Sequence, residues 1–335
     1  MKESIPIYPS IHVKNPFPKN IIEKDKIYFE PYLQQYVSEF YLTNLNNVAV
    51  YYKHIAKGFW IKKKYCSSHP ITFVDRFKLI FKYFFYDTVH VKEAVSLVTL
   101  FGANYHHFLV EVIPLVIHAK RNLPKHIPML IPSYYLRFTY IKSYLEFLEV
   151  ELFPYQSRDK VIVEKLHVFK NLQISFFNRD LIRDIRQTFV PQSQGSPSRK
   201  LFISRSKATR RKILEEEKLY HTLNEFGFEI LNLEELSIEE QIRSFSNAAI
   251  VLGMHGAGLT NMVFMPPGGR VGELRAITTE TSVYNVFYCL ANSCDHQFFY
   301  LFGKGDHTKN KFSNFECSEQ EFRSFLLELT NYGTR

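Results

Sequence analysis

Between about residue 94 and residue 189, short apolar runs alternate with longer segments of helical periodicity. The apolar runs predict strands at 94–100, 127–131 and 161–169. The periodic segments predict helices at 105–119, 134–149 and 179–189. Pro114 should kink the first of these helices, because proline lacks an N–H and clashes with the preceding turn. Strands that alternate with helices indicate a parallel sheet with crossover helices, whereas residues 1–90 have weak periodicity and predict only short strands and loops.

The same alternation returns in the second half of the chain. Turn-forming residues at 190–198 interrupt it and predict a linker. After this linker the pattern predicts strands at 200–204, 228–231, 249–253 and 270–274, and helices at 211–226 and 238–247. A capping box from Ser237 to Glu240 opens the last helix. The chain is therefore expected to be an α/β protein with two Rossmann-like domains facing a cleft, at residues 1–190 and 199–335.

The stretch 249–265 is the feature around which the rest is arranged. Its apolar strand ends at Gly253, and three glycines within six positions allow a sharp turn into a short apolar helix. The first N–H groups of that helix would be unpaired and positively polarised, which suits a phosphate. His255, Thr260 and Asn261 add polar groups. The pattern is neither G-x-G-x-x-G nor a Walker loop, so plain α/β architecture remains the alternative.

Two further groups of residues could take part in binding or catalysis. The basic segment 204–211 lies between a predicted strand and a predicted helix, so it should contact a diphosphate or form a solvated helix entrance. His107 and Glu111 are four residues apart on one helix face and could act together as a general base. The alternatives are a structural pair, or a metal pair without a visible third ligand. Glu273 should lie at the carboxyl end of its strand, where parallel sheets bind ligands.

Composition and charge predict the kind of partner and the cellular compartment of the protein. A net charge of +9 favours an anionic partner. Basic clusters at 62–64 and 199–212 would suit an anionic membrane surface or could be solvated faces. The start of the sequence has no apolar leader and no run is long enough to span a membrane, which predicts a cytoplasmic protein. Four scattered cysteines indicate reduced thiols. Five aromatic residues are expected mainly in the core, with base stacking or the lining of a sugar pocket as the alternative: Tyr284, Tyr288, Phe298, Phe299 and Tyr300.

These constellations occur in the order found in one family. The sequence resembles the family 61 glycosyltransferases over roughly residues 95–300, and H-G-A-G-L-T-N is the most specific part of the match. The matching pieces are Asn104-Tyr105-His106-His107 with Glu111 and Pro114, Ser204-Arg205 with Arg210-Arg211, and residues 251–261 with 264–268 and Glu273.

The resemblance implies a GT-B fold, with an acceptor domain followed by a nucleotide-sugar domain. It implies an inverting enzyme that needs neither cofactor nor metal and moves a sugar, with GlcNAc and xylose as candidates, from a UDP-sugar. The acceptor would be a glycan or lipid-linked saccharide in bacterial surface polysaccharide or lipopolysaccharide synthesis, on the inner face of the cytoplasmic membrane, with no nucleic acid involved. A basic Rossmann-type protein that binds a nucleotide or nucleic acid without chemistry is the alternative function.

The resemblance and the residues together assign the site. Asn104 and Tyr105 would lie on the acceptor side, and His107 or Glu111 would be the base. Glu273 would bind the nucleoside ribose. The remaining donor-binding residues would be Arg205, Arg210, His255, Gly256, Ala257, Gly258, Leu259, Thr260 and Asn261.

Overall fold

The computed structural model describes residues 4–51, 54–56, 77, 81, 84–99, 101–170, 177–190, 196–277, 285–306 and 313–332. The chain divides into two compact units. The first unit comprises residues 1–10 and 38–174, and the second comprises residues 11–37 and 175–335. The predicted division at 1–190 and 199–335 therefore differs in two places, because residues 11–37 and 175–190 both belong with the second half of the chain.

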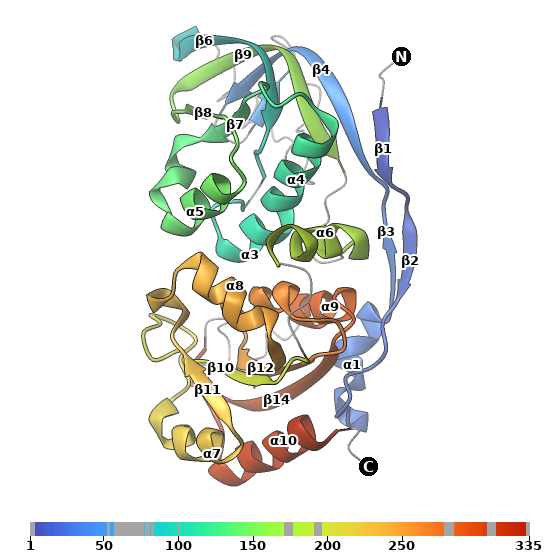
Figure 1. Ribbon diagram of the computed structural model, residues 1–335, viewed down its shortest axis with the longest axis vertical. Helices are drawn as coiled ribbons and strands as arrows, with labels where there is room; N and C mark the ends of the chain where they lie inside the picture. Colours follow the sequence, from blue (N-terminus) through green and yellow to red (C-terminus); the bar gives the residue numbers. More distant parts are fainter. Residues whose placement is uncertain are drawn as a thin grey trace. The chain divides into compact units, whose positions relative to one another are not determined.

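The first unit is built on a mixed sheet in the strand order β1-β4-β9-β6-β7-β8, with β5 paired to β4 (Figure 1). The strands are β1 (Ser4–Tyr8), β4 (Phe40–Tyr51), β5 (His54–Ala56), β6 (Asp87–Ser96), β7 (Met129–Pro132), β8 (Leu152–Tyr155) and β9 (Asp159–Lys170). β4 runs antiparallel to β1, β5 and β9, whereas β9, β6, β7 and β8 are parallel. The parallel arrangement predicted from residues 94–189 is confirmed for β6, β7 and β9, whereas the residues before 90, for which only short strands and loops were predicted, supply the long antiparallel strand β4.

The helix predicted at 105–119 consists of three segments. These are α3 (Tyr105–His107), the π-helical segment η3 (Phe108–Val112) and α4 (Ile113–Asn122). Pro114 lies in the first turn of α4, where its missing N–H costs least. The π-helical turn therefore takes up the change of register that a proline inside one continuous helix would force, and such turns are frequent at functional sites. The helix predicted at 134–149 is split in the same way, into η4 (Ser133–Arg137) and α5 (Thr139–Phe147).

The second unit has a six-stranded sheet in the order β11-β10-β12-β13-β14-β15, of which only β15 is antiparallel. The strands are β10 (Arg199–Ile203), β11 (Phe228–Leu231), β12 (Ala248–Met254), β13 (Arg270–Ile277), β14 (Gln297–Gly305) and β15 (Phe315–Glu316). The helices are α6 (Arg179–Phe189), α7 (Tyr220–Glu225), α8 (Ile238–Ser246), α9 (Val286–Ser293) and α10 (Glu319–Asn331).

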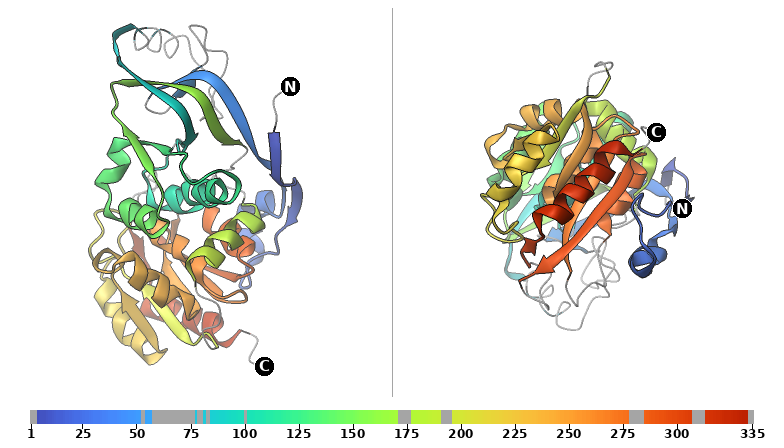
Figure 2. Two further views of the ribbon diagram at one scale, coloured as in Figure 1. Left: turned by 45° about the horizontal axis from the view of Figure 1, so that its top comes forward. Right: turned by 90° about the horizontal axis from the view of Figure 1, so that it is seen from below.

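Helices cover both faces of this second sheet. In Figure 1, α8 and α9 lie on one face and α7 and α10 on the other, and the right view of Figure 2 shows α10 lying over the sheet, roughly along the strands. Phe322 and Phe325 of α10 pack in one buried cluster with Leu252, Leu274 and Phe299 from three neighbouring strands. Burial of this apolar surface, at about 25 cal/mol per Å², is the main stabilising contribution to the layer. The predicted parallel arrangement is confirmed for this half.

The helix predicted at 211–226 is wrong in its first part. Arg211 and Glu215 have positive φ angles of 54° and 50°, and helical structure starts only with η5 (Glu216–Leu219). The carboxylate of Glu216 accepts hydrogen bonds from the backbone N–H of Arg205 and the hydroxyl of Ser204, at 2.8 and 2.5 Å. These bonds hold η5 against the end of β10, so the preceding residues form a loop rather than a helix. The capping box at Ser237 is present as predicted.

Residues 11–37 pack on the second unit and contain β2 (Ile11–Lys14), α1 (Lys26–Phe29) and β3 (Gln34–Val37). The backbone N–H of Lys19 donates to Phe298 O at 2.8 Å, and the Tyr288 hydroxyl donates to Pro16 O at 2.7 Å. Four of the predicted aromatic residues are buried in the core: Tyr288, Phe298, Phe299 and Tyr300. All but Phe299 also form hydrogen bonds with this segment. Tyr284, the 62–64 cluster and most of the predicted linker lie outside the described residues.

Helix α6 also belongs to the second unit. Arg186 Nε donates to Met265 O at 3.0 Å, and the rings of Phe189 and Phe264 meet edge to face at 6.2 Å. The described part of the predicted linker, residues 190 and 196–198, therefore lies within the second unit, after α6.

A buried histidine in this unit should make the stability of the protein depend on pH. His296 is 4% exposed, and its Nε2–H donates to Met262 O at 3.0 Å. Burial lowers the pKa of His296 to about 4. The unfolded chain, with a histidine pKa of about 6.5, binds this proton first, so the free energy of unfolding should fall by about 3 kcal/mol as pH drops from 6.5 to 4. Urea unfolding measured at several pH values in this range gives the free energy of unfolding as a function of pH. This free energy should fall less steeply with falling pH in His296→Gln than in wild type, and the same pH dependence in both proteins would contradict the assignment.

Candidate active site

The predicted glycine turn lies at the carboxyl end of β12, the strand between β10 and β13. The backbone N–H of His255 donates to Leu274 O at 2.9 Å and continues the sheet by one residue. The short helix predicted after the turn is present as η7 (Ala257–Phe264), a 3-10 helix. As in any helix, the first N–H groups of this segment have no acceptor within the helix itself. They lie at the edge of the parallel sheet where α/β proteins bind ligands.

Two of the predicted donor-binding residues point inward. Thr260 and Asn261 are fully buried, and Asn261 Nδ2 donates to Gln241 Oε1 and to Gly258 O, each at 3.2 Å. These bonds fix the turn against α8. Leu259 is also buried, so among the residues of this turn His255, Ala257 and Gly258 keep partial exposure.

The two central glycines differ in what surrounds them. A Cβ on Gly258 would lie 2.9 Å from Leu233 Cδ1 and 3.2 Å from Ile203 Cγ2, so close packing requires a glycine there. A Cβ on Gly256 would lie 3.5 Å from Arg205 Nη1, an ordinary contact, and the φ of Gly256 is 179°, which any residue adopts. The fold therefore needs glycine at 258 but not at 256, where its smallness leaves room beside the guanidinium group.

His255 is held by a buried chain of polar groups. Its Nδ1 donates to Glu273 Oε1, and Arg275 Nη2 donates to Glu273 Oε2 at 2.7 Å. Arg275 Nη1 in turn donates to Asn285 Oδ1 at 2.8 Å. Glu273 is 1% exposed and both its oxygens have protein partners, so it lies behind His255 and its carboxylate is already occupied. A carboxylate only accepts, which places the imidazole proton on Nδ1 and leaves Nε2 as the outer polar atom.

The charges of this chain follow from burial and pairing. Burial alone raises the pKa of Glu273, but Arg275 and His255 outweigh burial and hold that pKa below its usual value. Burial lowers the pKa of His255, against the opposing effect of the Glu273 carboxylate. At neutral pH the ring is therefore mainly neutral, beside an ionised Glu273. The His255 side chain keeps 17% exposure.

Two guanidinium groups lie beside the turn. Arg205 donates from Nε to Arg211 O at 3.2 Å and from Nη2 to Arg210 O at 2.8 Å, which fixes its plane. Arg211 Nη1 donates to His255 O at 3.4 Å. Burial lowers the pKa of Arg205 and of Arg211, yet guanidinium groups remain charged in proteins. Arg205, Arg211 and His255 thus surround Gly256, while the side chain of Arg210 is exposed.

Arg275 was not predicted as a site residue. Arg211 was predicted only as part of the basic segment 204–211, for diphosphate contact or a solvated helix entrance, and was not singled out as a donor-binding residue. Arg275 follows Glu273 by two residues on β13, so the period of a strand places both side chains on one face. That spacing is the signal that could have identified it.

A second His–Glu pair occupies the start of the predicted helix in the first unit. The Asn104 side chain accepts from the backbone N–H of His106 and caps α3. Tyr105 lies within hydrogen-bond distance of Tyr144, with 3.2 Å between their hydroxyls. His107 Nδ1 lies 2.5 Å from Glu111 Oε1. The exposed fractions are 19% for the His107 side chain and 6% for that of Glu111, so the imidazole is the accessible member of the pair.

Sheet and turn together define an α/β protein in which two arginine side chains and His255 lie at the carboxyl end of a parallel strand. The chain belongs to the glycosyltransferase 61 family, whose model matches residues 105–272, half of the chain. Among the described residues, no helix is both long and apolar enough to cross a membrane.

Two relatives show the level of similarity. The chain is 29% identical over 140 residues to the bovine (Bos taurus) EGF domain-specific O-linked N-acetylglucosamine transferase. It is 34% identical over 90 residues to protein O-linked-mannose beta-1,4-N-acetylglucosaminyltransferase 2 of Takifugu rubripes. The matches cover 36% and 26% of this chain but only 26% and 15% of those two proteins.

Proposed function

We propose that this protein moves a sugar from a UDP-sugar to a hydroxyl acceptor with inversion, as a GT-B-type enzyme that needs no metal ion. The observation that carries the proposal is the cationic turn, in which Arg205, Arg211 and His255 surround Gly256 at the carboxyl end of β12. Departure of a nucleoside diphosphate develops negative charge on phosphate oxygens. Fixed cations and backbone N–H groups in a partly buried site stabilise such charge without further reorganisation.

Within this proposal the histidine binds the diphosphate and the buried groups position it. Glu273 was expected at the ribose, but its two oxygens are bonded to His255 and Arg275. It acts instead by holding the His255 ring with Nε2 outward and by supporting its protonated form when a phosphate binds. Leu259, Thr260 and Asn261 shape the turn from inside, and Arg210 serves through its carbonyl, which holds Arg205.

The acceptor step needs a base, and the proposal gives this role to His107. Glu111 accepts from Nδ1, so Nε2 of His107 can take the proton of the acceptor hydroxyl. The acceptor oxygen then forms a bond to the anomeric carbon, while the bond from that carbon to the diphosphate oxygen breaks and UDP leaves with the electron pair. One displacement inverts the configuration. Asn104 caps the helix that carries the base and is a positioning residue.

The relatives' names and the charge suggest the substrates. N-acetylglucosamine is the first donor sugar to test, because both relatives are named for its transfer. The acceptor in this proposal is a glycan or lipid-linked saccharide of a surface polysaccharide or lipopolysaccharide. The net charge of +9 would favour work beside an anionic membrane surface in the cytoplasm.

Protection of the folded state distinguishes this proposal from a nucleic-acid-binding function. Thermal unfolding should be recorded with UDP in EDTA, with UDP and Mg²⁺, and with a short RNA. A ligand that binds only the folded state raises Tm, so UDP should raise it equally with and without the metal. Stabilisation by RNA alone would favour the non-catalytic alternative, and stabilisation by UDP only with Mg²⁺ would contradict the metal-independent site.

The two glycines predict separable defects. Gly256→Ala should leave the Tm of the free protein unchanged but weaken UDP binding, because the added methyl group occupies space beside Arg205. Gly258→Ala should lower the free energy of unfolding by about 1–3 kcal/mol through overpacking against Leu233 and Ile203. Urea unfolding and UDP titration of both variants give the comparison. Normal UDP affinity in Gly256→Ala would show that the ligand does not approach this residue.

A further inference from the structure

A pocket of about 250 Å³ lies at the carboxyl ends of β7 and β8 in the first unit. It is lined by Ser133, Tyr134, Arg137, Tyr155, Gln156 and Ser157. β7 ends at Pro132 and β8 at Tyr155, and the two strands are parallel neighbours. The pocket therefore occupies the edge of this sheet where α/β proteins bind ligands.

The lining has the chemistry of a site for an anionic saccharide. Arg137 is exposed and none of the lining residues is acidic. The Oγ of Ser133 is buried and forms no hydrogen bond to any described residue. Hydroxyl and amide groups suit sugar hydroxyls, whereas a planar guanidinium matches the paired oxygens of a carboxylate or phosphate. The nearest acid of the β8–β9 turn, Asp159, accepts from the backbone N–H of Gln156 at 2.6 Å.

The pocket is tied to the loop that leads to the proposed base. The Tyr135 hydroxyl donates to Thr99 O at 3.2 Å, and the Tyr140 hydroxyl donates to Ala103 O at 2.6 Å. Thr99 and Ala103 precede α3, on which His107 lies. The segment that carries Arg137 and the loop before the base are therefore held in one arrangement, as acceptor positioning requires.

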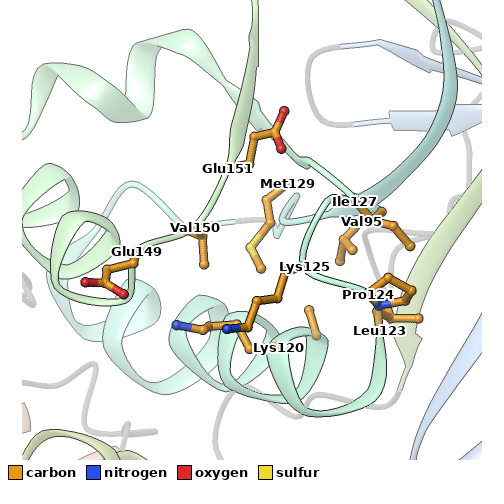
Figure 3. A pocket seen from close by; sticks show the side chains of 11 residues that line it. Val95, Lys120, Leu123, Pro124, Lys125, Ile127, Met129, Glu149, Val150 and Glu151 are labelled. Atoms are coloured by element: carbon orange, nitrogen blue, oxygen red, sulfur yellow. The ribbon is translucent and has the colours of Figure 1, made fainter.

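A second pocket, of about 170 Å³, lacks this chemistry. Figure 3 shows it near the start of β7, with the Lys120 and Lys125 side chains on one side and Glu149 and Glu151 elsewhere on its rim. Two lysines and two glutamates balance in charge, and the ammonium group of Lys120 donates to Leu148 O at the end of α5. The charge of this lining therefore favours neither sign of ligand.

We propose that the Arg137 pocket is an acceptor subsite that binds an anionic group, carboxylate or phosphate, of the saccharide acceptor. The identification of the ligand as the acceptor rests on the proposed function, whereas binding of an anionic saccharide to this pocket does not require turnover. It assigns the acceptor to acidic or phosphorylated saccharides and makes Arg137 the residue that selects them.

The test measures binding by calorimetry or ligand-observed NMR. The probes are methyl β-glucuronide, glucose 6-phosphate and the neutral methyl β-glucoside, each with wild type, Arg137→Ala and Arg158→Ala. Arg158 is the matched control, since it is exposed in the neighbouring turn and does not line the pocket. At least one anionic probe should bind wild type at least about tenfold more tightly than the neutral one, as expected for one charge-assisted pair. Arg137→Ala should abolish that difference, and Arg158→Ala should keep it.

The outcomes separate the subsite from the transferase assignment. Preference for the glucuronide or for the sugar phosphate identifies which anion the pocket selects, and either result supports the proposal. Equal binding of charged and neutral probes, or an unchanged preference in Arg137→Ala, would overturn it. UDP affinity, measured on the same samples, should be the same in all three proteins. If wild type does not bind UDP but Arg137→Ala still removes the preference for the anionic probe, the proposed function is contradicted while the anion-binding pocket is supported.

Discussion

Replacing His107 with alanine is expected to reduce sugar transfer by about 10²–10⁴-fold, the usual loss on removal of a general base. The imidazole is the accessible member of its pair, and Glu111 lies behind it with 6% of its side chain exposed. The sequence left the base open between these two residues; their burial favours His107. UDP affinity should not change, because the proposed donor groups belong to the second unit. Steady-state rates and UDP titration of the same preparation measure both effects.

Glu111→Gln is the matched variant for this prediction. Glutamine keeps the shape of the side chain and can still accept from Nδ1–H of His107, but it lacks the negative charge that stabilises the imidazolium formed when the base takes its proton. Transfer should therefore fall, but less than in His107→Ala. A larger loss in Glu111→Gln than in His107→Ala would make the carboxylate the base. Wild-type rates in both variants would place the base elsewhere.

His255→Ala should weaken UDP binding by about 10–150-fold, the equivalent of losing one hydrogen bond of about 1.5–3 kcal/mol to a charged group. The fold should persist, since the side chain stands at the end of β12 and keeps partial exposure. Glu273→Gln should reproduce part of the defect, because it releases the ring while leaving the imidazole in place. Unchanged affinity in His255→Ala by calorimetry would remove this residue from the donor site.

Proton uptake gives the same prediction a second readout. Burial lowers the pKa of His255 in the free protein, whereas a bound diphosphate favours the protonated ring. Binding of UDP should therefore take up protons near neutral pH, and affinity should fall as pH rises from the pKa of the free protein to that of the complex. Calorimetry in buffers of different ionisation enthalpy measures this uptake. His255→Ala should show only the uptake that belongs to UDP itself.

Local pattern was enough to predict the parts of this molecule whose partners are close in sequence. The alternation after residue 198, the limits of α6 and the capping box of α8 all follow from periodicity and nearby polar contacts. Three glycines predicted the turn at the end of β12, whereas the hydrogen bond from Asn261 to Gln241 of α8 joins residues 20 positions apart and could not be predicted locally.

The parts that were not predictable depend on contacts between distant residues. Residues 11–37 join the second unit through bonds to Phe298 and Tyr288, more than 250 positions away, and no local signal marks such pairing. Glu216 replaces the predicted start of a helix with a loop because its carboxylate binds the end of β10. The occupied carboxylate of Glu273 likewise follows from Arg275, which local reading did not connect with His255.

The most direct test of the account is release of UDP from a panel of UDP-sugars, beginning with UDP-GlcNAc and UDP-xylose, in the presence of EDTA. Wild-type protein should release UDP from at least one of these donors with a hydroxyl acceptor or with water, and His255→Ala should release it much more slowly at equal donor concentration. No release above the level of heat-inactivated protein, from any donor and with or without added Mg²⁺, would contradict UDP-sugar transfer, and release that requires Mg²⁺ would contradict the metal-independent site.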